Sequence, residues 1–179
     1  MTGCGLVLFE TTIGRCGIAW SGRGIAAVAL PAPREEATRA PLIRRCPQAK
    51  EGPPPAPAQA AIEGIVALLR GEPRDLSAIE LDMDGVAPFE RRVYQVARTI
   101  SPGATLSYGE IAAHLGNPRA ARDVGQALGR NPFPIVVPCH RVVATGGKLG
   151  GFSAPGGGAT KRRLLAIEAQ WMPALPLFR

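Results

Sequence analysis

The spacing of apolar residues changes near residue 86, and this change limits the 179-residue chain to a fold with two unlike parts. Before residue 86 the apolar runs are short and glycine-containing turns separate them, as in LVLFETTIG, RCGIAW and GIAAVALP. This pattern is typical of β-hairpins. After residue 86 apolar residues recur every three or four positions, as they do in helices. We therefore expect a small sheet first and mainly helices afterwards.

The first part, residues 1–86, is predicted to be a small antiparallel sheet with a helix over 58–70 that ends at Gly71. Residues 77–83 alternate as a strand would, and we expect them to return to the sheet. Residues 34–45 are expected to form no more than a helical turn or two, because Pro41 interrupts them.

The second part, residues 87–179, is predicted to be a mainly helical domain. Helices are expected over 89–100 and 160–171, with two short ones over 107–116 and 119–130. The short pair resembles a helix-turn-helix of winged-helix type, and an ordinary helical hairpin is the alternative. The fold class is therefore α/β, of the α+β kind, with a domain boundary between residues 86 and 87.

The positive charge of the chain is concentrated in the second part. Residues 1–86 carry 9 Lys and Arg against 10 Asp and Glu, whereas residues 87–179 carry 12 against 4. A field of this sign suits a polyanion, because each neutralised phosphate releases counterions. Simple solubility explains it about equally well. No run reaches the roughly 18 apolar residues of a membrane span, so we expect a cytoplasmic protein without membrane contact.

The cysteines do not form a recognisable metal site or disulfide framework. The four are Cys4, Cys16, Cys46 and Cys139, and none forms a CxxC pair. Zinc-finger spacing is absent, since the histidines are only His114 and His140. We expect reduced thiols, with no metal and no cofactor.

The segment NPFPIVVPCHRVV, residues 131–143, holds the candidate reactive group. Its apolar run between Pro134 and Pro138 is expected to fix the backbone and to place Cys139 where the chain leaves the core. A thiol reacts as its thiolate, so it needs a base or a positive charge nearby, and His140 and Arg141 are candidates. Since neighbouring side chains point to opposite faces, His140 would act through a water. The alternative is an unreactive buried cysteine.

PCHRV, beginning at Pro138, resembles the active-site motif of the O6-alkylguanine-DNA alkyltransferases. Further segments resemble the family in order and at similar spacing: FERRVY at 89, SYGEIA at 107, GNPRAARDVG at 116, NPFP at 131 and KRRLLAIE at 161. The resemblance covers roughly residues 87–170, and the first 86 residues share only a general plan.

The resemblance implies a set of catalytic roles. Cys139 would attack the alkyl carbon in an SN2 displacement. His140 would accept the thiol proton through water, and Glu168 would hold the imidazole in the required tautomer. Tyr108 would donate a hydrogen bond to a ring nitrogen of the departing guanine, and Asn131 would brace the turn that carries the cysteine.

The resemblance also implies how double-stranded DNA containing O6-alkylguanine is bound. The guanine flips out, Arg122 fills the gap, and small residues such as Ala121 let the second short helix approach the minor groove. Ser153 would bind O6, and the Val142 carbonyl would accept a hydrogen bond from the exocyclic amine. Phosphate contacts are expected from Arg119, Arg130 and Lys161, for which solvated surface charge is the alternative.

Some residues depart from the family pattern. Phe152 stands where a tyrosine is common, and the following loop SAPGGGAT is about two residues longer than usual, which bears on Ser153. Asp123 puts a negative charge on the expected DNA helix, unless it points inward or toward Arg119. No histidine precedes His114, so the zinc site of some relatives is not expected.

The sequence favours a monomeric repair transferase in which each molecule acts once, because a thioether on Cys139 has no evident route back. A second hypothesis is a module that recognises alkylated guanine and recruits repair factors without transfer. A third is a cysteine hydrolase, but residues 131–168 suggest no water-activating step. Whether methyl groups, larger adducts or O4-alkylthymine are preferred is not determined by the sequence.

Overall fold

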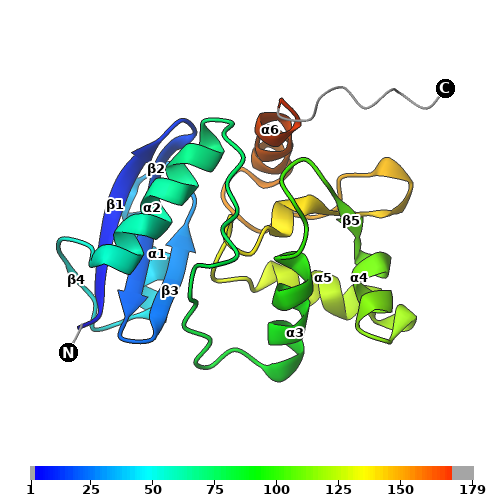
Figure 1. Ribbon diagram of the computed structural model, residues 1–179, viewed down its shortest axis with the longest axis horizontal. Coiled ribbons are helices and arrows are strands. Elements are labelled where there is room, and N and C mark those ends of the chain that lie inside the picture. The colour runs from blue at the N-terminus through cyan, green and yellow to red at the C-terminus, as the bar shows by residue number, and fades with distance from the viewer. Residues whose placement is uncertain (1–2, 171–179) are drawn as a thin grey trace.

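The N-terminal lobe, residues 3–86, is built on a four-stranded sheet. The computed structural model describes residues 3–170 (Figure 1). The strands are β1 (Gly5–Thr11), β2 (Gly14–Ser21), β3 (Gly24–Ala29) and β4 (Lys50–Glu51), in the spatial order β3-β2-β1-β4. The first three form antiparallel hairpins as predicted, and β4 pairs with β1 in parallel.

Two helices cover the two faces of this sheet, α1 (Glu35–Arg45) and α2 (Ala56–Leu69). Alternate strand residues face different helices: Ile18 packs in the cluster that includes α2, whereas Ala19 packs with Leu42 of α1. The helix α2 was predicted within two residues of its ends.

The prediction that Pro41 would interrupt residues 34–45 is wrong. The helix α1 runs for 11 residues with Pro41 inside it. Proline removes one backbone donor, but Thr38 and Leu42 on the same helix are buried against the sheet. Their tertiary packing outweighs the local penalty.

The prediction of a strand over 77–83 is also wrong. This segment makes a single bridge, Leu81 with Ile25, supported by hydrogen bonds from Ile25 N to Glu80 O and from Asp82 N to Ile25 O. The preceding carbonyls bind elsewhere, because Arg98 Nη2 donates to those of Leu76, Ser77 and Ile79. A side chain from the other lobe thus takes the acceptors that a strand would use.

The C-terminal lobe, residues 87–170, contains the predicted helix-turn-helix. Its helices are α3 (Pro88–Ala97), α4 (Tyr108–His114) and α5 (Ala121–Gly129), and the short 3₁₀ helix η1 (Pro118–Ala120) lies between the last two. A capping box begins α4, since Ser107 Oγ accepts from Glu110 N and the Glu110 carboxylate accepts from Ser107 N. Tyr94 of α3 donates to Ala127 O of α5 and joins these helices.

The remaining elements carry the motif around Cys139. A 3₁₀ turn η2 (Cys139–Arg141) leads into β6 (Val142–Val143), which pairs in parallel with β5 (Leu106–Ser107). The 3₁₀ turn η3 (Thr145–Gly147) follows, and α6 (Gly157–Ala169) ends the described chain. The helix α6 therefore begins three residues before the predicted start, and Trp171 lies outside the described residues.

The two lobes share one apolar core. A single cluster contains Ile18 and Ile65 of the N-terminal lobe together with Val93, Val124 and Leu164 of the C-terminal lobe.

A sheet and helices in one chain confirm the predicted α/β fold class. The boundary at residue 86 falls just before α3, and division into two independent domains stays a prediction. Within residues 3–170, no helix is long and apolar enough to cross a bilayer.

Candidate active site

The turn that carries Cys139 is held by the Asn131 side chain. Asn131 Nδ2 donates to Val137 O at 2.9 Å, and Asn131 Oδ1 accepts from Phe133 N at 2.8 Å. Ile135, between them, has a φ of 75°, the left-handed region that a branched residue rarely adopts. Such a conformation costs about 1–3 kcal/mol and persists because the surrounding contacts hold it. Asn131 thus lies where the resemblance expects the bracing residue.

His140 and Glu168 form the buried pair that the resemblance implies. His140 Nε2 lies 2.7 Å from Glu168 Oε1 and donates to it. Arg141 binds the same carboxylate, with Nε 3.0 Å from Oε2 and Nη2 2.8 Å from Oε1, while its Nη1 donates to Ile100 O. Burial alone would raise the pKa of Glu168, but the hydrogen bonds from His140 and Arg141 lower it to about 2.

The other ring nitrogen of His140 is free to act as a base. Within residues 3–170, the buried Nδ1 atom has no hydrogen-bond partner. Burial lowers the pKa of His140, and the Glu168 carboxylate only partly opposes this, so the imidazole is neutral near pH 7. With the proton on Nε2 facing Glu168, Nδ1 carries the lone pair. The pair can therefore accept a proton at Nδ1.

A reaction at the Cys139 thiol would need such a base. Burial raises the pKa of this thiol, and a hydrogen bond with the Asn131 side chain and the charge of Lys161 oppose the rise. The resting group is therefore the thiol, and a nearby acceptor must take its proton before attack. Arg141, the other candidate from the sequence, has its guanidinium bound to Glu168 and Ile100 instead.

Lys161 does not lie where its predicted phosphate contact requires. Its side chain is fully buried. Nζ donates to Val142 O at 2.6 Å and to Gly151 O at 3.1 Å, and lies 3.5 Å from the Tyr108 hydroxyl. It is therefore a structural cation of the pocket and not a surface charge. Its position on one face of α6 with Leu164 and Glu168, at a helical spacing, is the signal that could have shown this.

A cavity of about 750 Å³ brings most of the predicted substrate residues together. Cys139 lines it together with residues of α4 and α5. The predicted site residues that line it are Tyr108, Ala121, Arg122, Cys139 and Ser153. Arg122 is exposed near the start of α5, so the cavity opens beside the predicted DNA-binding helix.

Two side-chain hydroxyls of this cavity donate to backbone carbonyls that also line it. The Tyr108 hydroxyl donates to Gly151 O at 3.3 Å, and Ser153 Oγ donates to Gly129 O at 2.9 Å. The Val142 carbonyl already accepts from Lys161 but keeps a second lone pair.

The predicted phosphate-contact arginines differ in their surroundings. Arg130 is exposed but forms an ion pair with Glu90 at 3.0 Å, which reduces its availability. Arg119 is exposed, and none of the ion pairs found between residues 3 and 170 includes it or Asp123. Asp123 is exposed, so its predicted pairing with Arg119 or inward orientation is not observed.

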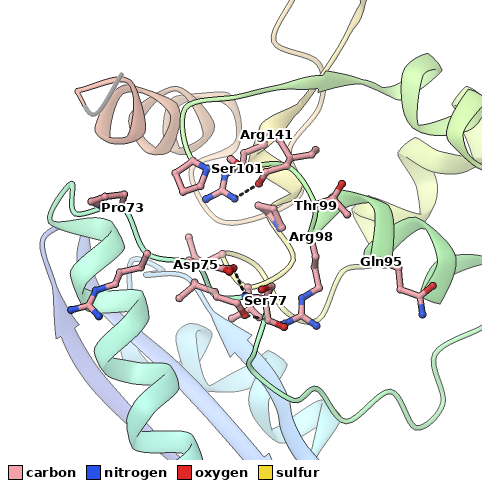
Figure 2. Close-up of a pocket in the computed structure, with 15 residues that line it drawn as sticks. Pro73, Asp75, Ser77, Gln95, Arg98, Thr99, Ser101 and Arg141 are labelled. Carbon is pink, nitrogen blue, oxygen red and sulfur yellow. Dashed lines mark hydrogen bonds between the residues drawn. The ribbon is translucent and has the colours of Figure 1, made fainter. Parts of the chain in front are cut away.

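A second cavity, of about 730 Å³, is lined by residues of both lobes, among them Asp75, Ser101 and Arg141 (Figure 2). Pro138 and Arg141 line it, but Cys139 does not. Arg98, the residue directly after α3, donates a hydrogen bond to Ser77 O. This bond attaches the segment between the lobes to the C-terminal lobe. No group of three or more possible metal ligands occurs in the part of the chain that the structure describes.

A helix-turn-helix lies beside a cavity that contains a half-buried cysteine, and a buried histidine–glutamate pair follows that cysteine. These features together define the class of DNA-binding proteins that react through a thiol. Residues 88–170 match the family of the 6-O-methylguanine DNA methyltransferase, DNA binding domain. A methylated-DNA–protein-cysteine methyltransferase of Mycolicibacterium paratuberculosis is 50% identical over 119 residues, which are 66% of this chain and 70% of the relative. This chain belongs to the methylated-DNA–protein-cysteine methyltransferase family.

Solved structures of related proteins agree over nearly the whole chain. The crystal structure of the Mycobacterium tuberculosis O6-methylguanine methyltransferase is 34% identical, has a TM-score of 0.76, and is matched over 96% of both chains. The structure of the Mycobacterium tuberculosis protein in complex with DNA has a TM-score of 0.73 over 94% of this chain and 95% of that one. The present protein thus repairs DNA by transferring an alkyl group to a cysteine, as the sequence predicted, and DNA is its partner.

Proposed function

We propose that Cys139 is the alkyl acceptor and that each molecule reacts once with O6-alkylguanine. The observation that carries this proposal is the position of Cys139 in the cavity beside Arg122. The other cysteines all lie in the N-terminal lobe. Cys4 is exposed, whereas Cys16 and Cys46 are buried.

The proposed reaction begins with removal of the thiol proton. His140 Nδ1 accepts it through a water, and the Glu168 carboxylate stabilises the imidazolium that forms. The thiolate then attacks the alkyl carbon in line with the C–O6 bond. A C–S bond forms, the C–O bond breaks, and its electron pair leaves with the guanine.

The departing guanine needs its developing charge neutralised. We assign this role to the Tyr108 hydroxyl, at a ring nitrogen, and to Ser153, at O6, because both line the same cavity as Cys139. The Val142 carbonyl would accept a hydrogen bond from the exocyclic amine. The product on Cys139 is a thioether, and no group in the cavity can restore the thiol, so turnover stops.

We further propose that the base enters the cavity by flipping out of the duplex. Arg122 would occupy the space it leaves, and Ala121 and Gly125 would allow α5 to approach the minor groove closely. Phosphate contacts are assigned to Arg119 and, more weakly, to Arg130. Since the cavity and α5 come from one chain, a monomer suffices. A reduced thiol and a DNA substrate favour the cytoplasm.

The test is stoichiometric methyl transfer from a duplex oligonucleotide that contains O6-methylguanine. Intact mass should rise by one methyl group per protein, and peptide mapping should place it on Cys139. A Cys139→Ser variant is the control and should remain unmodified. Repeated turnover, or label on Cys4, Cys16 or Cys46, would reject the proposal, and binding without label would favour a recognition module.

A further inference from the structure

The N-terminal lobe contacts the turn that carries the reactive cysteine. Val28 N, on the edge strand β3, donates to Pro132 O at 2.9 Å. Pro132 follows Asn131, whose side chain holds the turn. The segment before Cys139 is therefore attached to the sheet of the other lobe.

A second contact comes from Arg45, the last residue of α1. Its Nε donates to Ala26 O at 3.2 Å and its Nη2 to Asp82 O at 2.8 Å, which fixes the guanidinium within the N-terminal lobe. The guanidinium carbon then lies 6.0 Å from the centroid of the Phe133 ring, within the range of a cation–π contact. Phe133 is fully buried.

Phe133 is connected to the turn that carries Cys139 through the Asn131 side chain. Its backbone N–H donates to Asn131 Oδ1 and so sets the orientation of that amide. The same amide donates through Nδ2 to Val137 O, two residues before Cys139. Val137 O also accepts from Cys139 N at 2.8 Å, so the Asn131 amide and the Cys139 backbone share one acceptor. The nearby Asn131 side chain also acts to lower the pKa of Cys139, against the effect of burial.

We propose that Arg45 is a positioning residue for alkyl transfer, which holds Phe133 and thereby keeps the Asn131 side chain bound to the turn that carries Cys139. The inference rests on the proposed role of Cys139 as acceptor. It gives the N-terminal lobe a part in the reaction, although none of its residues has to touch the substrate.

This role predicts a change in the pH dependence of the thiol. If the Phe133 segment loosens, Asn131 loses its orientation and the pKa of Cys139 rises further. A smaller fraction of thiolate is then present near neutral pH, and the rate falls there. At high pH the thiol ionises in both proteins, so the difference should disappear. A purely structural role would lower stability without this pH dependence.

The experiment compares Arg45→Gln with Arg44→Gln in the full chain. Arg44 is its exposed neighbour on α1 and makes no side-chain hydrogen bond or ion pair in the described chain. The probe is iodoacetamide, a small neutral electrophile, with peptide mapping to follow Cys139 alone. At pH 7 we expect Arg45→Gln to react about tenfold more slowly, the equivalent of one pKa unit. The deficit should vanish as the pH rises, and Arg44→Gln should match the unmodified protein.

Two further measurements separate the possible outcomes. Phe133→Leu keeps an apolar side chain but removes the ring, and it should shift the pH profile in the same direction. If Arg45→Gln does not fold, this variant decides the question. An unchanged profile in the folded variants, or a loss equal at every pH, would overturn the inference. If the unmodified protein transfers no methyl group to Cys139 from the oligonucleotide, the proposed function itself fails, whatever Arg45 does.

Discussion

Glu168 combines its proposed catalytic role with a structural one. It is buried, it accepts hydrogen bonds from His140 and Arg141, and these bonds lower its pKa to about 2. A carboxylate whose pKa is lower in the folded state stabilises the fold above its unfolded pKa and loses this effect as the pH falls toward the folded value. The stabilisation should therefore be complete near pH 7 and fade between about pH 4.5 and pH 2. The Glu168 side chain thus links the stability of the fold to His140, the proposed proton acceptor.

Glu168→Gln should accordingly destabilise the protein by about 3 kcal/mol at pH 7, because it leaves Arg141 buried beside a neutral amide. Urea unfolding of the variant and the unmodified protein at pH 7 and pH 3 would measure this. We expect the difference to shrink at pH 3, and methyl transfer at pH 7 to be slower. Glu63→Gln, at an exposed position on α2, should change neither quantity. An equal loss at both pH values would show that the carboxylate charge is unimportant.

The helix α5 has one buried face and one exposed face. Val124, Ala127 and Leu128 are buried against the core, whereas Arg122 is exposed at the mouth of the cavity. Arg122 is expected to replace the flipped base in the duplex. Flipping that base out costs a few kcal/mol. The proposed mechanism gives Arg122 no part in the chemical step.

Arg122→Ala should therefore slow methyl transfer from duplex DNA by about tenfold or more, while the reaction with free O6-benzylguanine changes little, provided that this base enters the cavity. Single-turnover rates on the two substrates give the comparison. Arg162→Ala, on the exposed side of α6, removes the same charge elsewhere and should affect neither rate. Equal losses on both substrates would instead assign Arg122 to the pocket or to folding.

For the whole molecule, the charge difference between the halves predicts how DNA is held. The excess of basic residues lies in the half that contains α4 and α5. Affinity for undamaged duplex should fall steeply with salt, and a lost phosphate contact should reduce the slope by about one. Arg119→Glu should weaken binding more than Arg130→Glu, since Glu90 already pairs with Arg130.

Titration of labelled duplex at several salt concentrations would test this order. Arg70→Glu in the N-terminal lobe is the control and should leave the slope unchanged. If both reversals in the C-terminal lobe match that control, the proposed DNA face is wrong, even if Cys139 still accepts alkyl groups.

The sequence by itself determined the elements whose signals are local. Hairpins, the helix-turn-helix and the Cys139–His140 motif depend on turn residues and short-range spacing, so residue order was enough to predict them. Prediction from the sequence failed where contacts between distant residues compete with local conformational preference. Packing of Leu42 carries α1 through Pro41, and Arg98 takes the carbonyls that a strand over 77–83 would have used.

Only the tertiary structure decided which charges are buried and what they bind. The sequence predicted Lys161 to be a surface cation, yet its ammonium group binds the carbonyls of Val142 and Gly151 in the folded protein. Arg45 meets Phe133 across 88 positions of chain, so no pattern within either segment could show their contact. The packing of distant segments decides how deeply a charged side chain is buried and what it binds. Burial and binding partners in turn set the pKa of that side chain and its role.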